Sequence, residues 1–393
     1  MGEVKLAIIG CGGMAGAHLR GYAALKKAGF DGFEIVATCD IDENRAISFA
    51  DRIEELQGNR PRTYREVEEL LEREELDAAD VCTPHHQHHT VAIACLERGV
   101  DVLVEKPLAV TVKAGRRMIE AAERNGRILA VAEQVRRWIS SRAIWWVFSS
   151  GMLGEPKLIY TCSVSYRGID PRNPKVDRPK PWREDIFKGG GGWVLDVGVH
   201  YADMLRFIFG EIEEVYAVAD NLTRVTYSDG PSTVEDTVNA VLKFENGAVG
   251  MWSWSKGAPG ASLSYNLFSG RLGSIYSPGH YPTKPELRMW NGEVKGTEEL
   301  MKMFLESIDE ETRERFFPMG LRDGVAIELY DFIRAVTERG RPEVDGWEGL
   351  KAQAVCEAFF ESSALGRPVR VEEVLEGGVE VYQREINERW GIE

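Results

Sequence analysis

The first third of the chain alternates short apolar runs with amphipathic stretches. Short apolar runs bounded by turn residues are typical of strands buried on both faces, whereas the stretches between them have the spacing of surface helices. This alternation predicts an α/β fold with a doubly wound parallel sheet and crossover helices. The expected strands cover residues 5–9, 34–39, 79–83, 100–105 and 128–131, and the first expected helix covers 14–27.

After residue 133 the pattern changes to longer strand-like stretches with turn residues between them. Short links between successive strands favour antiparallel pairing. Asn246-Gly247 lies between two such stretches and predicts a type I′ hairpin. We therefore expect two domains, over residues 1–133 and 134–393, the second an α+β domain with a large open, mainly antiparallel sheet. Its expected strands cover 157–166, 214–219, 237–244, 247–254 and 262–268, and its marked helices 193–209, 327–339 and 349–365.

The composition is that of a globular protein without a surface for polyanions. The chain has 393 residues, of which 44% are hydrophobic and 28% charged, and its formal net charge is −15. This balance argues against nucleic acid or an anionic membrane as a partner, because both attract clustered Lys and Arg. It also favours an uncharged substrate over a polyanionic one.

Location is indicated by the cysteines and by the apolar runs. Six scattered cysteines with no C-x-x-C pair are typical of a reducing compartment. No apolar run approaches the roughly 18 residues of a membrane span. The N-terminal residues lack the basic and apolar regions of a secretory leader. We expect a cytoplasmic protein.

A glycine turn directly follows the first expected strand. It fits the pattern G-x-G-x-x-A, in which glycines permit a tight turn and close approach to a pyrophosphate, and a small third residue lets helix and strand pack closely. The helix that follows would present free N–H groups to the phosphates. This arrangement predicts a Rossmann dinucleotide-binding domain. The residues concerned are Gly10, Gly12, Gly13, Met14 and Ala15.

Asp40 stands at the end of the second expected strand, where a carboxylate can accept hydrogen bonds from a ribose diol. The same carboxylate would repel a 2′-phosphate, so NAD is favoured over NADP as the cofactor. The alternative is that Asp40 only caps the next helix.

Candidate chemistry lies at Lys106 and in the segment 189–200. Lys106 follows an apolar strand, in the region where open α/β sheets bind ligands, although a strand-end Lys is often only a solvated charge. Asp196 and His200 are four residues apart on an expected helix, so both side chains would fall on one face. An imidazole can take a proton from a hydroxyl at neutral pH. A buried His held by an Asp is the competing interpretation.

Taken together, these motifs resemble one family of oxidoreductases, the glucose–fructose oxidoreductase / inositol dehydrogenase / rhizopine-catabolism (GFO/IDH/MocA) family. The resemblance covers nearly the whole chain, and the only departure in the glycine motif is Ala15 for the third glycine. The matching positions, in order, are Gly10, Gly12, Ala15, His18, Thr83, Pro84, His88, Glu105, Lys106, Pro107, Trp182, Arg183, Asp196 and His200.

The resemblance implies an NAD-dependent enzyme that oxidises a secondary alcohol of a sugar, anhydrosugar or inositol. It implies that Lys106 hydrogen-bonds the reacting hydroxyl, that His200 is the acid/base and that Asp196 assists. It also implies a homo-oligomer, a dimer or tetramer, with contacts made by the second domain's sheet. Candidate residues on the nicotinamide and ribose side are Thr83, Pro84, His85, His88, Glu105, Lys106, Trp182 and Arg183, and further substrate candidates are Gln134 and Tyr166.

Three other interpretations stay open. The histidines in 85–89 suggest a metal, but no Cys or carboxylate stands at a recognisable ligand spacing, so we predict none. Some relatives use NAD transiently to eliminate a glycosidic bond. A related co-repressor keeps the architecture for ligand sensing without turnover. The sequence does not identify the sugar or polyol, the carbon oxidised or the direction of the reaction.

Overall fold

The computed structural model describes residues 3–392 and divides into two compact units. The first runs up to Gln134 and includes Glu314–Leu350, and the second comprises Val135–Arg313 and Lys351–Glu393. The chain leaves the first unit after Gln134. The return of 314–350 to that unit was not anticipated from the sequence.

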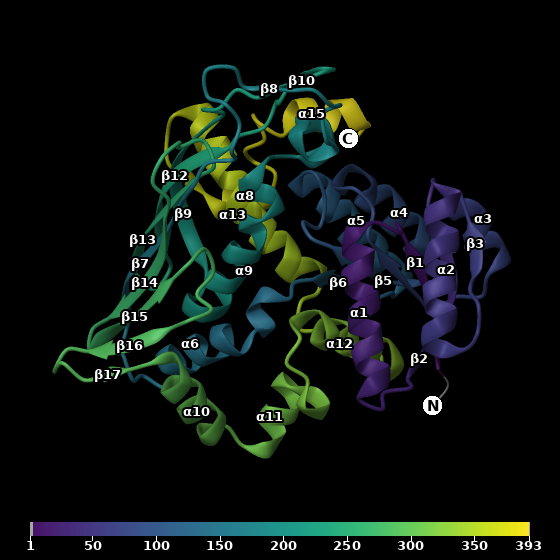
Figure 1. Ribbon diagram of the computed structural model, residues 1–393, viewed down its shortest axis with the longest axis horizontal. Helices are drawn as coiled ribbons and strands as arrows, with labels where there is room; N and C mark the ends of the chain where they lie inside the picture. Colours follow the sequence, from purple (N-terminus) through teal and green to yellow (C-terminus); the bar gives the residue numbers. More distant parts are fainter. Residues whose placement is uncertain (1–2, 393) are drawn as a thin grey trace. The chain divides into compact units, whose positions relative to one another are not determined.

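The first unit is built on a six-stranded parallel sheet with the strand order β3-β2-β1-β4-β5-β6 (Figure 1). The order reverses between β1 and β4, which is where doubly wound sheets bind ligands. The predicted Rossmann fold is confirmed. The strands are β1 (Val4–Ile9), β2 (Phe33–Cys39), β3 (Arg62–Tyr64), β4 (Ala78–Val81), β5 (Asp101–Glu105) and β6 (Leu129–Ala132). The helices are α1 (Gly13–Lys27), α2 (Glu43–Gln57), α3 (Val67–Arg73), α4 (His85–Glu97), α5 (Val112–Asn125) and α12 (Gly324–Glu338), with a 3₁₀ turn η3 (Pro318–Gly320).

Helix α12 joins the first unit because its apolar face packs on α1. Leu329, Phe332 and Ile333 belong to the same buried core as the strand residues Leu6 and Ile8. A single methyl group added to α1 at Gly21 would lie 2.7 Å from the side chain of Leu329, which shows how closely the two helices approach.

The second unit contains a nine-stranded sheet, ordered β17-β16-β15-β14-β7-β13-β12-β9-β18. All neighbouring strands are antiparallel except β7 and β13, so the mainly antiparallel sheet is confirmed. Its strands are β7 (Pro156–Val164), β9 (Ile212–Asp220), β12 (Thr237–Phe244), β13 (Val249–Ser255), β14 (Leu263–Gly270), β15 (Gly273–Pro278), β16 (Glu286–Met289), β17 (Val294–Lys295) and β18 (Val369–Arg370). A small sheet holds β8 (Lys175–Val176), β10 (Thr226–Tyr227) and β11 (Gly230–Pro231).

Several helices of this part of the chain were not expected from the sequence, among them α6 and α10. The helices and 3₁₀ turns are η1 (Val135–Arg137), α6 (Ile139–Ser149), η2 (Trp182–Glu184), α7 (Ile186–Gly189), α8 (Trp193–Asp196), α9 (Gly198–Phe209), α10 (Thr297–Ser307), α11 (Glu310–Phe316), α13 (Gly346–Leu365), α14 (Val371–Leu375) and α15 (Arg384–Trp390). Two local predictions were wrong. The helix expected over 193–209 is broken at Val197. The β12–β13 hairpin is not type I′, because that turn needs positive φ at both central residues and only Gly247 has it.

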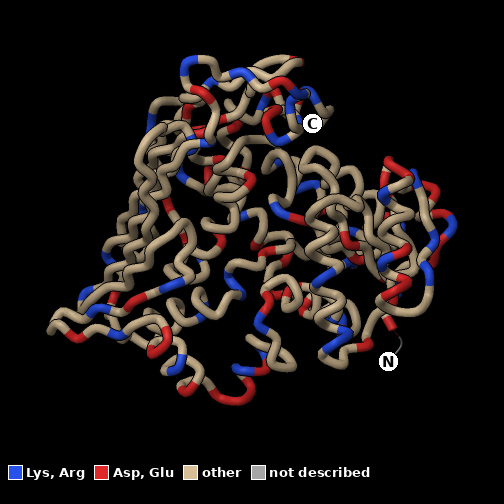
Figure 2. Tube along the Cα trace, in the orientation of Figure 1, with Lys and Arg blue, Asp and Glu red and all other residues tan. Residues whose placement is uncertain are grey.

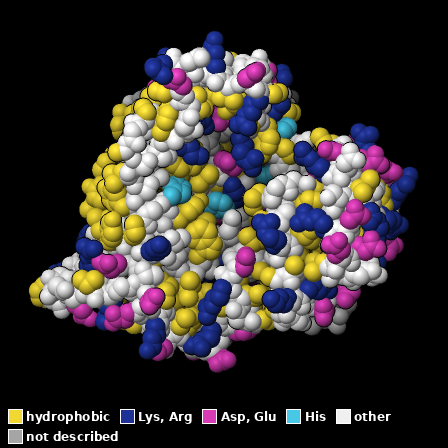
Figure 3. All heavy atoms as spheres, viewed as in Figure 1, with side chains coloured by type: hydrophobic (Ala, Val, Ile, Leu, Met, Phe, Trp, Pro, Cys, Tyr) yellow, Lys and Arg dark blue, Asp and Glu magenta, His cyan; other side chains and the backbone are white. Residues whose placement is uncertain are grey.

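One face of the large sheet is buried and the other is open. Side chains along β12 alternate between buried and exposed, as a half-buried strand requires. On the open face Tyr216, Val241 and Met251 are direct cross-strand neighbours and each is 44–50% exposed. Figure 3 shows apolar side chains gathered along the left margin, over these strands, and Figure 2 shows few charged residues there.

Candidate active site

The turn after β1 has the shape that a dinucleotide needs. Gly10 has a φ of +91°, and a Cβ at this position would lie 2.7 Å from the backbone of Cys82, so only glycine fits. A Cβ on Gly12 or Gly13 would meet no atom within 4 Å, so open space faces the start of α1. Among the described residues no side chain caps this helix, which leaves its first N–H groups for an anion. Met14 and Ala15 lie in that first turn.

Asp40 is fixed beside this turn. Its Oδ2 accepts the N–H of Cys11 at 2.8 Å, and its Oδ1 accepts the N–H of Asp42 at 2.9 Å. The N-cap of α2 is Asp42, whose side chain accepts from Asn44, so Asp40 is not the cap of that helix. Each oxygen of Asp40 retains acceptor capacity for a ribose hydroxyl. The residues of the turn therefore fit a pyrophosphate and an adenosine ribose.

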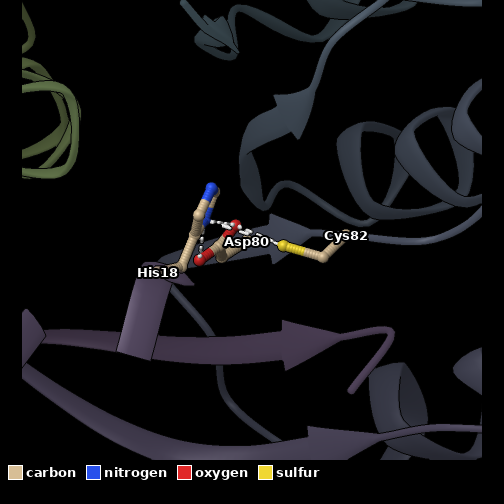
Figure 4. Close-up of side chains that lie close together, drawn as sticks. All are labelled: His18, Asp80 and Cys82. Carbon is tan, nitrogen blue, oxygen red and sulfur yellow. Dashed lines mark hydrogen bonds and ion pairs between the residues drawn. The ribbon is translucent and has the colours of Figure 1, made fainter. Parts of the chain in front are cut away.

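His18 of α1 lies at the centre of a buried polar network (Figure 4). Its Nδ1 is 2.9 Å from both carboxylate oxygens of Asp80, and its Nε2 is 2.9 Å from Oε1 of Glu105. Tyr22 donates its hydroxyl to Asp80 at 3.0 Å. Oε1 of Glu328, on α12, lies 3.9 Å from Nε2 of His18. The resemblance included His18, but its carboxylate partners come from distant strands and from a helix of the returning segment.

This network has the character of an ion pair. Burial lowers the pKa of His18. The charge of Asp80 and its hydrogen bond outweigh this effect, so the pKa lies well above the ordinary value. Burial, together with Asp80, raises the pKa of the neighbouring Cys82 thiol. The donor atoms of His18, Asp80 and Cys82 lie within 4.8 Å of one another, close enough to share a metal ion. A protonated imidazole and a protonated thiol do not coordinate metals, however. This supports the expectation that no metal binds here, which stays a prediction.

The network reaches the backbone of Lys106. The second oxygen of Glu105 accepts the N–H of Lys106 at 3.1 Å. The Lys106–Pro107 peptide bond is cis. His88 joins two strand ends, because its Nδ1 lies 2.9 Å from the carbonyl oxygen of Pro107 and its Nε2 lies 2.8 Å from that of Thr83. Burial lowers the pKa of His88 to about 4, so the ring is neutral and one nitrogen donates. Five of the predicted positions thus share one edge of the sheet, namely Thr83, His88, Glu105, Lys106 and Pro107.

Pro84 and His85 complete this edge, as the N-cap and the first residue of α4. Gln134, the last residue of the first unit before the chain leaves it, is half-buried. These three positions remain predicted site residues.

In the second unit, Glu235 holds the glycine run that precedes α8. Its two carboxylate oxygens accept the N–H groups of Gly192 at 2.6 Å and Val194 at 2.8 Å. A Cβ at Gly192 would lie 2.2 Å from the carbonyl oxygen of Glu235, so no larger residue fits. The absence of a side chain at Gly192 therefore lets the backbone approach Glu235 closely. Burial raises the pKa of Glu235 to about 7, although the two backbone N–H groups oppose the rise.

Asp196 and His200 lie on either side of the break at Val197, at the end of α8 and in the first turn of α9. Arg183 donates from Nε to Oδ2 of Asp196 at 3.1 Å, and its guanidinium lies over the ring of Trp182 at 4.1 Å. The second unit thus brings together three of the predicted residues, Trp182, Arg183 and Asp196. His200 is 5% exposed.

Tyr166 lies at the edge of the large sheet, bridging to Gly257, and its hydroxyl donates to the carbonyl oxygen of Ile169. It is half-buried and remains a predicted substrate residue. Sequence reasoning missed Lys256 and His280, which both contact Trp193. Neither stands in a recognisable motif.

Family models match both parts of the chain. Residues 4–133 match a model described as "Oxidoreductase family, NAD-binding Rossmann fold", and residues 142–276 match the "GFO/IDH/MocA C-terminal domain".

Individual relatives are distant but extensive. The chain is 27% identical over 374 residues to myo-inositol 2-dehydrogenase of Thermotoga maritima, covering 95% of this chain and all of that one. It is 26% identical over 321 residues to levoglucosan dehydrogenase of Pseudarthrobacter phenanthrenivorans, covering 75% and 80%. A solved levoglucosan dehydrogenase in complex with NADH and L-sorbose superimposes with a TM-score of 0.78 at 22% identity, over 94% of this chain and 99% of that one. In the part of the chain that the structure describes, no helix is long and apolar enough to span a membrane.

Proposed function

The chain belongs to the GFO/IDH/MocA family of NAD-binding oxidoreductases, and on that premise we propose that it is a sugar or polyol dehydrogenase in which Lys106, Asp196 and His200 act on the reacting hydroxyl. The observation that carries the proposal is the glycine turn with Asp40 fixed beside it, because this pair fits a dinucleotide without a 2′-phosphate. The relatives named for inositol and levoglucosan support a polyhydroxylated substrate.

In this proposal NAD, when bound, supplies the hydride acceptor, and the protein handles the proton. His200 takes the hydroxyl proton from the substrate. Lys106 donates a hydrogen bond to the oxygen as negative charge develops there. Asp196, held by Arg183, orients the imidazole or the substrate hydroxyl. Two sets of hydrogen bonds support these roles, because each fixes a segment that carries a proposed catalytic residue. Glu105 accepts the backbone N–H of Lys106, and Glu235 accepts those of Gly192 and Val194.

The test is NADH absorbance at 340 nm while the purified protein with NAD is screened against inositols, aldoses, anhydrosugars and glycosides. We expect a rise with one of these groups. Lys106→Ala and His200→Asn should each lower kcat by about 100-fold or more if they handle the proton as general acid–base groups. Near-wild-type rates in both variants would refute the assignment. Glycoside cleavage without net NADH release would favour transient oxidation instead, and tight NADH binding with no turnover would favour a sensor.

We also propose that the open face of the nine-stranded sheet joins copies of the chain into a dimer or tetramer. Tyr216, Val241 and Met251 form a continuous apolar row there, and exposed apolar rows of this kind usually mark protein interfaces. Light scattering of the purified protein tests this directly, and a monomer at micromolar concentration would refute it.

A further inference from the structure

A second group of side chains lies beside Asp196 in the second unit. Trp193 begins α8, three residues before Asp196, so the two side chains are neighbours on one helical turn. Lys256 follows β13, and His280 follows β15, so three distant segments meet at Trp193. The catalytic roles proposed above use none of these three residues.

Lys256 lies near Asp196, Glu184 and Glu235, whose charges raise its pKa, but it makes no direct ion pair with them. Its Nζ lies 4.3 Å from the ring centroid of Trp193 and, among residues 3–392, makes no ion pair with a carboxylate within 4.0 Å. The neighbouring cations are paired, since Arg183 bonds Asp196 at 3.1 Å and Arg167 bonds Glu184 at 2.6 Å. Burial, followed by the charge of Arg167, lowers the pKa of Lys256. A half-buried ammonium in this state gains from any anion that reaches it.

His280 braces the ring on which Lys256 lies. The His280 and Trp193 rings stack with centroids 5.2 Å apart and planes 17° apart, and the His280 centroid is 4.2 Å from that of Trp254. Both ring nitrogens of His280 are shielded and have no hydrogen-bond partner among the described residues. Burial, followed by the charge of Lys256, lowers its pKa to about 4, so the ring is neutral. A neutral ring beside Lys256 adds no competing charge, and its stacking fixes the plane of the indole.

We infer that Lys256 binds a carboxylate of the substrate above the indole of Trp193, so that the natural substrate is a sugar acid, an aldonate or a uronate. The inference rests on the proposed function and names its substrate class. It replaces the expectation of an uncharged substrate, which came from the net charge of the whole chain and not from local charges.

The charge balance selects a carboxylate over a phosphate. One unpaired ammonium matches one negative charge. The neighbouring cations Arg167 and Arg183 are already neutralised by their own carboxylates. With Arg167 and Arg183 engaged by these carboxylates, neither arginine is left to pair with the second charge of a phosphate monoester. A neutral hydroxyl would leave the ammonium uncompensated. His280 has a positioning role in this scheme, through Trp193.

The experiment is isothermal titration of the protein saturated with NADH, so that an alcohol cannot be oxidised during the measurement. Acids are compared with matched neutral partners: D-gluconate with D-glucitol, methyl β-D-glucuronide with methyl β-D-glucoside, and D-galacturonate with D-galactose. We expect at least one acid to bind tenfold or more tightly than its partner. Lys256→Gln should abolish that preference, because it removes the charge-assisted contact with the carboxylate. Lys256→Arg should keep most of it, and Lys284→Gln, an exposed lysine of the same unit, should leave it unchanged.

Three results would overturn the inference. One is that no acid binds more tightly than its neutral partner. Another is that Lys256→Gln, with a wild-type melting temperature, keeps the preference. The third is that D-glucose 6-phosphate binds more tightly than every acid, which would point to a phosphate site. Failure of the proposed function is recognised separately, because no sugar, polyol or acid would then reduce NAD at 340 nm, while titration of the acids still tests Lys256.

Discussion

The buried network around His18 offers the sharpest test of how the first unit is held together. The perturbation is Asp80→Asn, which keeps the shape of the side chain and removes one negative charge. Asp80 is fully buried and accepts from both His18 and Tyr22. An amide offers one acceptor oxygen in place of two and turns an N–H group towards one of these donors. His18 would keep Glu105, 2.9 Å from its Nε2, as a charged partner.

Removing one partner of a buried ion pair typically costs about 3–5 kcal/mol, because the other charge stays buried. The remaining contact with Glu105 places our expectation near the lower end, about 3 kcal/mol. For a unit of this size that loss corresponds to a fall in melting temperature of roughly 6–12 °C. His18→Leu should cost at least as much, since it removes the imidazolium from Asp80 and Glu105 together. The double variant should lose less than the sum of the two, by about 2 kcal/mol, because Asp80 and His18 are in direct contact.

The pH dependence has a definite sign. The folded pKa of His18 is raised, so its stabilising contribution is complete below the unfolded value near 6.5 and is lost as the pH rises through the folded value. The advantage of wild type over Asp80→Asn should therefore be full at pH 6 and narrow towards alkaline pH.

Differential scanning calorimetry from pH 6 to 9 measures this, and the transition that NADH shifts identifies the first unit. Asp77→Asn, an exposed carboxylate of the same unit, is the matched control and should change the melting temperature little. A loss in Asp80→Asn as small as that of the control, or strict additivity in the double variant, would refute the ion-pair description.

Three further predictions concern other parts of the molecule. Asp40→Ser should weaken NADH binding about tenfold in a fluorescence titration and reduce the preference of the protein for NADH over NADPH. An unchanged preference would contradict the proposal that Asp40 accepts hydrogen bonds from the adenosine ribose. Glu235→Gln should lower kcat about tenfold with an unchanged Kd for NADH, because an amide N–H would face the N–H of Gly192 or Val194. A wild-type kcat would show that these two hydrogen bonds do not affect catalysis. Met251→Glu should convert the oligomer to monomers by light scattering, since a charge would enter the apolar row, and an intact oligomer would place the interface elsewhere.

The parts of the fold that were predicted correctly depend on local patterns. Strand β1, the glycine turn and Asp40 follow one another within forty residues, and each needs a particular residue type at its place. The alternation along β12 likewise reports its half-buried state. The return of α12 to the first unit could not be predicted, because an apolar helix face does not specify which surface it covers. The break at Val197 could not be predicted either, since the 3.6-residue period continues across it.

The candidate site divides in the same way. Lys106, Asp196 and His200 could be proposed from motifs, whereas Glu235 and Lys256 act through contacts between segments about forty or more residues apart. Lys256 follows a strand whose pattern of Trp and Ser predicts only a buried face. Its meeting with Trp193 depends on the register of β13 against its neighbours, which no local pattern sets.

The segment of Lys106 and the segment that leads to Asp196 are fixed in the same way, by a buried carboxylate that accepts backbone N–H groups. Glu105 accepts from Lys106, and Glu235 accepts from Gly192 and Val194. The difference between them is charge, because Glu105 has the imidazolium of His18 beside it, whereas the pKa of Glu235 is raised to about 7 chiefly by burial. A raised carboxyl pKa stabilises the fold below its unfolded value near 4.5, and that contribution is lost as the pH rises to about 7. His18 continues the decline above pH 6.5. Below pH 6.5 the lowered pKa values of His88 and His280 oppose this decline, because the unfolded state then binds more protons. Between pH 6.5 and pH 8 the stability of both units should therefore fall, and melting temperatures that rise over this range would contradict the protonation states of His18 and Glu235.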